Sequence, residues 1–274
     1  MIGISTYAFT WRSHPSQAEP MTVHDMLDST AMLGARVFQW CDHPDLEEGN
    51  LRQLDSVRRH ANALDLVLET GTRGVDPGHL MAHLRRAERT GSPLVRSMLS
   101  DHHSRPTLNE AIEALRTVMP RFESAGITLA LETYEQFTSA DLVTVIEAVG
   151  SRSLGVCLDP SNSIGALEMP EDVVRRCAPH VVSHHVKDFA FSRLAGGVGF
   201  ALAGAPLGEG LLDHPRVMDQ LRAAGTAGVN RIIEHWLRPS PDLGETAKVE
   251  ERWVRDSVTY LTEYDRRYGI DSSR

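Results

Sequence analysis

The sequence predicts a (β/α)8 barrel, an α/β fold that spans residues 1–274 as a single domain. Eight short apolar runs rich in β-branched residues alternate with helix-like stretches and recur about every 30 residues, as in that fold. The 274 residues also suit a barrel that typically needs roughly 250. A doubly wound open sheet is the alternative, but no G-x-G-x-x-G follows the first run to bind a dinucleotide.

The elements follow in order along the chain. Apolar, β-branched-rich runs predict strands at 2–7, 36–40, 66–70, 94–99, 127–132, 155–159, 181–186 and 231–234. Apolar residues at helical spacing predict helices at 23–33, 51–64, 79–89, 108–123, 139–149, 171–177, 215–224 and 245–264. Gly34 suits the C-cap of the first helix.

Two connections, at 10–21 and 189–213, are longer than is usual in this fold. Each follows a strand, so both are expected on the face of the barrel where active sites lie. The second is rich in glycine. These connections either form a wall or lid over a substrate or are simple turns.

Composition limits the partners. A net charge of −9 argues against nucleic acid, whose phosphates require an excess of Lys and Arg. No apolar run approaches the roughly 18 residues of a membrane span. The N-terminal residues read as a strand and lack the basic start of a signal peptide. Three scattered cysteines suggest reduced thiols and a cytoplasmic protein.

Four potential metal ligands stand at the ends of the last four predicted strands: Glu132, Asp159, His185 and Glu234. Because parallel strands end at one rim of a barrel, we expect their side chains to converge there. Three carboxylates and an imidazole suit one Mn²⁺, Mg²⁺ or Co²⁺ ion, with Zn²⁺ as a further option. Such a cation leaves positions for two oxygens of an α-hydroxycarbonyl substrate and polarises its carbonyl.

The segments GISTYAF, LALETYEQFTS, GVCLDPSN, HHVKD, PLGEG and IIEHW resemble the xylose-isomerase-like TIM-barrel superfamily of sugar isomerases and epimerases. The resemblance implies that Glu132, Asp159, His185 and Glu234 bind one divalent metal and that Glu132 and Glu234 are the catalytic acid/base pair. It selects His185 over the adjacent His184, because His185 stands first in the H-x-K-D pattern. Adjacent strand residues face opposite sides, so only one of the two can enter the barrel.

The chain also departs from the family pattern. Asn162 occupies a position where many members have His, and Thr133 and Tyr134 follow Glu132 where members often have Asn and His. Asn162 can bond a sugar hydroxyl but is a poor transition-metal ligand. Members that cut abasic DNA hold three zinc ions with more histidines, and Asn162 and the acidic charge speak against that branch.

Further side chains are candidates for substrate binding. Lys187 shares the pleat direction of His185 and is expected inside the barrel, where it neutralises a carboxylate or an enolate oxygen. Glu135 and Glu209 either contact the substrate or are ordinary loop carboxylates. Glu69 and Arg96 end strands and form an ion pair or bind substrate. Aromatic residues could wall the pocket: Tyr7, Trp11, Trp40, His102, His103 and Trp236.

The function expected from these residues is a metal-dependent isomerase or epimerase of a keto-sugar or small hydroxy-carbonyl acid that acts through an enediolate. A lyase of the same superfamily, either a 3-oxo sugar acid decarboxylase or an inosose-type dehydratase, is the alternative. An inactive sugar-binding barrel and an abasic-site endonuclease are further alternatives. The expected partner is a small sugar or sugar acid, with no nucleic acid or membrane, and a homo-oligomer is left open.

Overall fold

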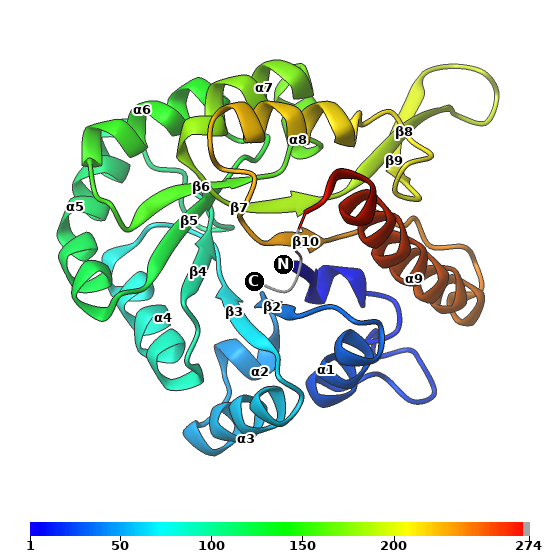
Figure 1. The fold of residues 1–274 in the computed structure, drawn as a ribbon, viewed down its shortest axis with the longest axis horizontal. Helices are drawn as coiled ribbons and strands as arrows, with labels where there is room; N and C mark the ends of the chain where they lie inside the picture. Colours follow the sequence, from blue (N-terminus) through cyan, green and yellow to red (C-terminus); the bar gives the residue numbers. More distant parts are fainter. Residues whose placement is uncertain (271–274) are drawn as a thin grey trace.

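The computed structural model describes residues 1–270, in which parallel strands close a barrel inside a ring of helices (Figure 1). Around the barrel the strands follow the order β1–β10–β7–β6–β5–β4–β3–β2, and each neighbouring pair is parallel. Their bounds are β1 Ile2–Ser5, β2 Val37–Cys41, β3 Val67–Gly71, β4 Leu94–Ser97, β5 Thr128–Glu132, β6 Leu154–Leu158, β7 Val181–Val186 and β10 Arg231–Ile233. The predicted (β/α)8 fold is confirmed.

The outer layer consists of helices α1 Val23–Met32, α2 Pro44–Glu47, α3 Leu51–Ala63, α4 Pro77–Thr90, α5 Leu108–Ala125, α6 Ser139–Val149, α7 Pro170–Cys177, α8 His214–Ala223 and α9 Leu243–Tyr268, with short 3-10 turns η1 Thr6–Ala8, η2 Asn162–Ala166 and η3 Ala178–His180. Several helices begin with a capping box, in which the N-cap side chain and the third helical residue bond each other's backbone N–H, as at Thr22 and Thr107. Helices α4 and α5 end at glycines with positive φ, Gly91 and Gly126.

Besides shifts of one to four residues at the ends of other elements, the structure differs from the prediction in three places. The first strand ends at Ser5 rather than at residue 7, because the Ser5 hydroxyl caps the turn η1 by accepting from Tyr7 N–H. The short helix α2 was not predicted. Residues 189–213, expected as a loop, contain most of an antiparallel hairpin of β8 (Asp188–Arg193) and β9 (Phe200–Ala205). This β8–β9 hairpin projects away from the barrel (Figure 1).

Apolar side chains fill the space between the barrel and the helices. Outward-facing residues such as Leu129, Leu131 and Val156 pack there against helical residues and are buried. The inward positions of several strands carry polar side chains that are buried as well, among them Gln39, Glu69, Arg96, Glu132 and His185. Buried polar groups need partners. The network that they form inside the barrel leads to the site at its C-terminal end.

Candidate metal centre and active site

Side chains along a β-strand point alternately to its two sides, and this alternation places the site residues inside the barrel. On β7, His185 faces the interior, and Lys187 follows it in the same direction. His184, directly before His185, faces the helices instead, where its ring is stacked 6.2 Å from the ring of His214. Only one of the two adjacent histidines therefore enters the barrel, as the alternation requires.

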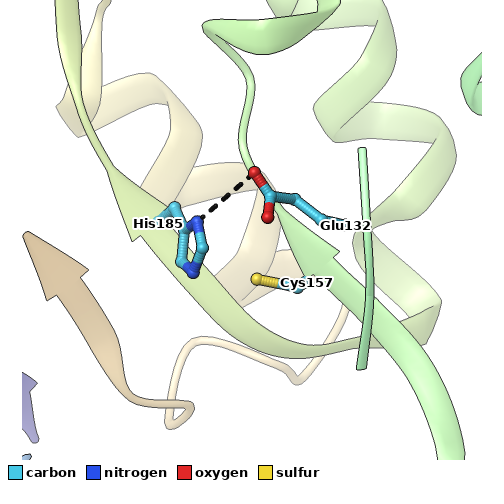
Figure 2. A group of neighbouring side chains, drawn as sticks. All are labelled: Glu132, Cys157 and His185. Carbon is cyan, nitrogen blue, oxygen red and sulfur yellow. Dashed lines mark ion pairs between the residues drawn. The ribbon is translucent and has the colours of Figure 1, made fainter. Parts of the chain in front are cut away.

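The four predicted ligands meet at one point. Glu132, Asp159, His185 and Glu234 are all buried, and each offers one ligand atom within 4.8 Å of the others. The His185 Nδ1 atom is 3.6 Å from Glu132 Oε1, 3.9 Å from Asp159 Oδ2 and 3.5 Å from Glu234 Oε2. Figure 2 shows His185 and Glu132 turned toward each other from β7 and β5.

A chain of hydrogen bonds orients the imidazole. His185 Nε2 lies 2.8 Å from Gln39 Oε1, an atom that can only accept, so Nε2 carries the proton in this bond. Gln39 keeps this orientation because its Nε2 donates to Glu69 Oε2 at 2.9 Å. Asn230 Nδ2 donates to the other Glu69 oxygen at 2.6 Å. In neutral His185 the Nδ1 lone pair is thereby directed at the carboxylates, an arrangement typical of metal-binding histidines.

The two predicted acid/base residues have different surroundings. Both oxygens of Glu132 are engaged: Oε2 accepts from Arg96 Nε, and Oε1 accepts from Asn162 Nδ2 at 2.6 Å. Glu234 Oε2 accepts from Lys187 Nζ at 3.2 Å, and Glu234 Oε1 is buried with no hydrogen-bond partner among residues 1–270. Glu132 is thus locked in place, whereas one oxygen of Glu234 is free to interact with a bound molecule.

Asp159 is held by its own backbone neighbours. Its Oδ1 accepts from the backbone N–H groups of Ser161 at 3.0 Å and Asn162 at 3.1 Å. Its Oδ2 lies 2.7 Å from Lys187 Nζ. Lys187 is therefore inside the barrel, as expected, and bridges Asp159 to Glu234 while its ammonium lies 4.7 Å from the Trp236 ring centroid.

The electrostatics of the cluster favour a positive charge at its centre. Burial opposes ionisation of Glu132, yet Arg96, His185 and Lys187 hold the pKa of this carboxyl well below its ordinary value. Burial would lower the pKa of His185, but the surrounding negative groups raise it well above the usual range. The His185 Nδ1 atom finds no hydrogen-bond acceptor or donor within the described chain. A divalent cation among these oxygen and nitrogen atoms fits this donor set.

A cavity of about 70 Å³ opens beside the cluster and is lined by Glu132, Glu234, Lys187 and Asn162 together with Tyr7, Arg73, Arg96, Met98, Tyr134, His235 and Trp236. On one side the Tyr7 hydroxyl donates to Asp42 Oδ2 at 2.5 Å and accepts from Arg73 Nη2 at 2.6 Å. Asp42 Oδ2 also accepts from Arg96 Nη1 at 3.1 Å. These contacts connect a second group of charges to Glu132 through Arg96.

Some predicted site residues lie elsewhere. Glu135 and Glu209 are exposed and are not among the residues that line the cavity. Glu69 and Arg96 do not pair with each other, because Glu69 accepts from Gln39 and Asn230 deep in the barrel, whereas Arg96 donates to Glu132. Of the predicted aromatic wall, Tyr7 and Trp236 line the cavity, Trp40 is buried, Trp11 bonds the Leu237 carbonyl, and His102 and His103 are exposed.

Besides Met98 and His235 in the cavity wall, four residues in or beside the site were missed from the sequence. Asp42 and Arg73 follow β2 and β3 at the functional rim, a position that could have drawn attention to them. Asp42 also has a positive φ of 48°, a strained conformation that often marks functional sites. Cys157 lies below Glu132 and His185 and forms a second possible ligand group with them (Figure 2), although burial raises the pKa of its thiol. Gln39 gave no signal, since its role depends on a contact across the barrel.

Comparisons with known proteins agree on the fold. Residues 73–264 match the family model described as xylose isomerase-like TIM barrel. The chain is 42% identical over 260 residues to the 3-oxo-isoapionate decarboxylase of Pectobacterium atrosepticum, which covers 95% of this chain and 94% of that protein. The structure of an L-ribulose 3-epimerase is similar with a TM-score of 0.72 at 19% identity, covering 100% and 98% of the two chains.

A xylose isomerase-like TIM barrel protein from Mycobacterium smegmatis, solved in complex with magnesium, is similar with a TM-score of 0.66 at 18% identity, covering 95% of this chain and 97% of that one. At 18% and 19% sequence identity, the similarity to these two structures supports a shared fold and nothing beyond it. Along residues 1–270, the helices are too short or too polar to cross a membrane. The predicted cytoplasmic location stays a prediction, as does the single domain over residues 1–274.

Proposed function

The chain belongs to the xylose isomerase-like TIM barrel family, and on that premise we propose that it is a divalent-metal-dependent decarboxylase of a 3-oxo sugar acid. This reaction is the lyase alternative considered from the sequence. The similarity to a 3-oxo-isoapionate decarboxylase over nearly the whole of both chains supports it and makes 3-oxo-isoapionate the first substrate to test.

The observation that carries the choice is the unequal state of the two glutamates. An epimerase needs a proton carrier on each face of the substrate, but Glu132 has both oxygens engaged, by Arg96 and Asn162. Arg96 also stabilises the ionised form of Glu132, which makes it a poor proton donor. A decarboxylation needs one proton donor, and Glu234, which lines the cavity and whose Oε1 has no hydrogen-bond partner among residues 1–270, can relay that proton.

The charges around the cavity suit an acidic substrate. Four carboxylates lie in the cluster and its adjoining group, and they face three cationic side chains: Glu132, Asp159, Glu234 and Asp42 against Arg73, Arg96 and Lys187. The net charge of these seven side chains is −1, and a bound divalent cation would change it to +1. A single positive charge matches one substrate carboxylate, whereas a neutral ketose has no charge to offer it.

Glu132, Asp159, His185 and Glu234 would hold the metal, whose chemistry is that of a Lewis acid toward the substrate's keto oxygen. In a 3-oxo acid the bond between C1 and C2 breaks, its electron pair moves toward the C3 carbonyl, and C1 leaves as CO₂. Lys187, held between Asp159 and Glu234, adds positive charge beside the developing negative charge. Glu234, ionised in the resting site, takes up a proton from solvent water and transfers it to C2, which completes a ketone one carbon shorter and leaves Glu234 ionised again.

Turnover of 3-oxo-isoapionate in D₂O tests the proposal. The full chain, stripped with a chelator and reloaded with Mn²⁺, should release one equivalent of CO₂ per substrate consumed, above the rate without protein. The product should carry one deuterium on the carbon that bore the carboxylate. Recovered substrate that has gained deuterium without release of CO₂ would instead identify an isomerase or epimerase.

An isomerase or epimerase is the second candidate, because Glu132 and Glu234 both line the cavity and could face opposite sides of a substrate. For that role the contacts of Glu132 with Arg96 and Asn162 would have to open during turnover. A panel of ketoses with Mn²⁺, followed by deuterium exchange at the carbon next to the carbonyl, distinguishes this candidate from the decarboxylase.

A further inference from the structure

A second concave surface lies apart from the catalytic cavity. A groove of about 550 Å³ runs between η2, the start of α7, the β8–β9 hairpin and α8. Most of its lining is apolar, including Ile164, Leu167, Met169, Phe191 and Leu211. Over the described part of the chain, the groove and the catalytic cavity share no lining residue.

The β8–β9 hairpin extends the apolar surface of this groove. In its antiparallel register Phe191 is opposite Leu202, and Arg193 is opposite Phe200. Residues opposite each other share one face of the sheet, as do residues two apart, so these four side chains lie on the face of Phe189. Phe189 is buried in the core and lines the groove, whereas Phe191 and Phe200 are exposed.

Leu167 is unexplained within one copy of the chain. It has a φ of 60° in the left-handed region, which leucine rarely adopts, and its side chain is 95% exposed. Asn or Gly would suit this backbone better, and a polar side chain would suit water better. A contact outside this copy would account for leucine at this position.

We propose that this hairpin–groove face binds a second copy of the chain in a twofold symmetric dimer. The face is defined here by its exposed apolar side chains Leu167, Met169, Phe191, Val198, Phe200 and Leu211, which are between 51% and 95% exposed. Their summed exposed area equals that of about four fully exposed large side chains, on the order of 700 Å². A standard interface buries about 800 Å² on each partner, so the summed apolar area of these side chains is close to what one partner of a stable dimer buries.

Shape favours a second copy over a small ligand. A twofold interface pairs a patch with itself, so the patch must contain both a projecting and a receiving part. The β8–β9 hairpin projects beyond the barrel (Figure 1), and the groove beside it is concave. The hairpin of each copy can therefore fill the groove of the other.

The charges of the groove and of the hairpin are also complementary. The charged side chains that line the groove are three acids and one base: Glu168, Glu171, Asp213 and Arg216. The hairpin carries Arg193 near its tip, where the guanidinium lies 4.4 Å from the Phe200 ring centroid, and its other charged residue, Asp188, is buried at its base. Glu171 pairs with Arg216 and Glu168 pairs with Arg176, whereas Asp213 accepts from a backbone N–H at the start of α8. Arg193 of one copy could therefore pair with Asp213 of the other.

Such a dimer would also restrain the catalytic site. The groove is bordered by η2, which starts at Asn162, and by β8, which starts directly after Lys187. Both residues contact the metal-ligand cluster, since Asn162 bonds Glu132 and Lys187 pairs with Asp159. A partner packed on these segments would therefore stabilise the conformation in which the cluster is assembled.

Analytical ultracentrifugation of the full chain tests the proposal. At 10 µM the protein should sediment at twice the 30.3 kDa chain mass. The double variant Leu167→Asn/Phe200→Ser should raise the dimer dissociation constant by about 100-fold or more. Both side chains are exposed, so the fold should be kept, which circular dichroism checks. Met32→Asn is the matched control, because Met32 is 82% exposed outside this face and its loss should leave the dimer intact.

Hydrogen exchange of the unmodified chain gives a second measurement that needs no variant. At a concentration above the dissociation constant, protection should increase in residues 164–169 and 189–213 compared with a dilute sample. A wild-type monomer at 100 µM would overturn the proposal. A dimer unaffected by the double variant, or protection confined to another surface, would overturn it as well.

Discussion

Gln39 should control metal affinity although it touches no metal. Substitution to Met keeps the side-chain length but removes both hydrogen bonds, the 2.8 Å contact with His185 Nε2 and the 2.9 Å contact with Glu69. His185 can then move its proton to Nδ1, the atom that faces Glu132 and Glu234, and that proton blocks ligation. Loss of such an orienting partner typically weakens metal binding 10–100-fold, about 1.4–2.8 kcal/mol.

Stability should fall too, by about 1–3 kcal/mol for each of the two buried groups left without a partner. Titration calorimetry of the chelator-stripped protein with Mn²⁺ measures the affinity, and urea denaturation measures the stability. Thr70→Val is the matched control: Thr70 is buried in β3 and bonds Ser92 and the Leu94 carbonyl, so its loss should lower stability and leave Mn²⁺ affinity unchanged. A Gln39→Met protein that binds Mn²⁺ within twofold of the wild type would refute the reasoning.

Three further predictions follow from the same contacts. Glu234→Gln should lower the decarboxylation kcat by roughly 10²–10⁴-fold in stopped assays with 3-oxo-isoapionate, since it removes the proposed proton donor; Glu135→Gln, an exposed control, should leave it unchanged. Arg96→Met leaves the buried Glu132 and the half-buried Asp42 without their shared cation. The loss of the buried pair with Glu132 should lower the free energy of unfolding by about 3–5 kcal/mol, which urea denaturation measures; a loss below about 1 kcal/mol would contradict this. Burial lowers the pKa of His214 to about 3, so below about pH 6.5 the unfolded chain takes up a proton that the folded chain does not, and the free energy of unfolding decreases as the pH is lowered. Between pH 7.5 and 5.5 the His214→Phe variant should therefore lose about 1 kcal/mol less of its free energy of unfolding than the wild type. An equal loss in both proteins would exclude His214 as the cause.

Periodicity was enough to predict the barrel, because each strand and helix buries an apolar face that repeats in the sequence. The strand assignments also predicted that Glu132, Asp159, His185 and Glu234 lie at one rim, since parallel strands end on the same side of the barrel. The β8–β9 hairpin escaped prediction for a physical reason. Strand β9 is rich in alanine and glycine, and β8 is exposed from Phe191 to Arg193. Neither strand contains the β-branched residues that mark a buried strand.

The partners of the site were harder to predict than the ligands. Gln39 and Glu69 lie on neighbouring strands and reach His185 and Asn230 across the barrel, and no local pattern encodes such contacts. The engagement of Glu132 by Arg96 likewise depends on which rotamers the crowded interior permits. The sequence therefore presented Glu132 and Glu234 as an equal pair, whereas their surroundings make them unequal.

Titration of the chelator-stripped protein with Mn²⁺ tests the central claim most directly, because every chemical role assigned above depends on one cation held by four side chains. The wild type should bind one Mn²⁺ per chain, and Asp159→Ala, which removes a buried ligand carboxylate, should bind at least about 100-fold more weakly. No saturable binding by the wild type, or equal binding by the variant, would contradict the account.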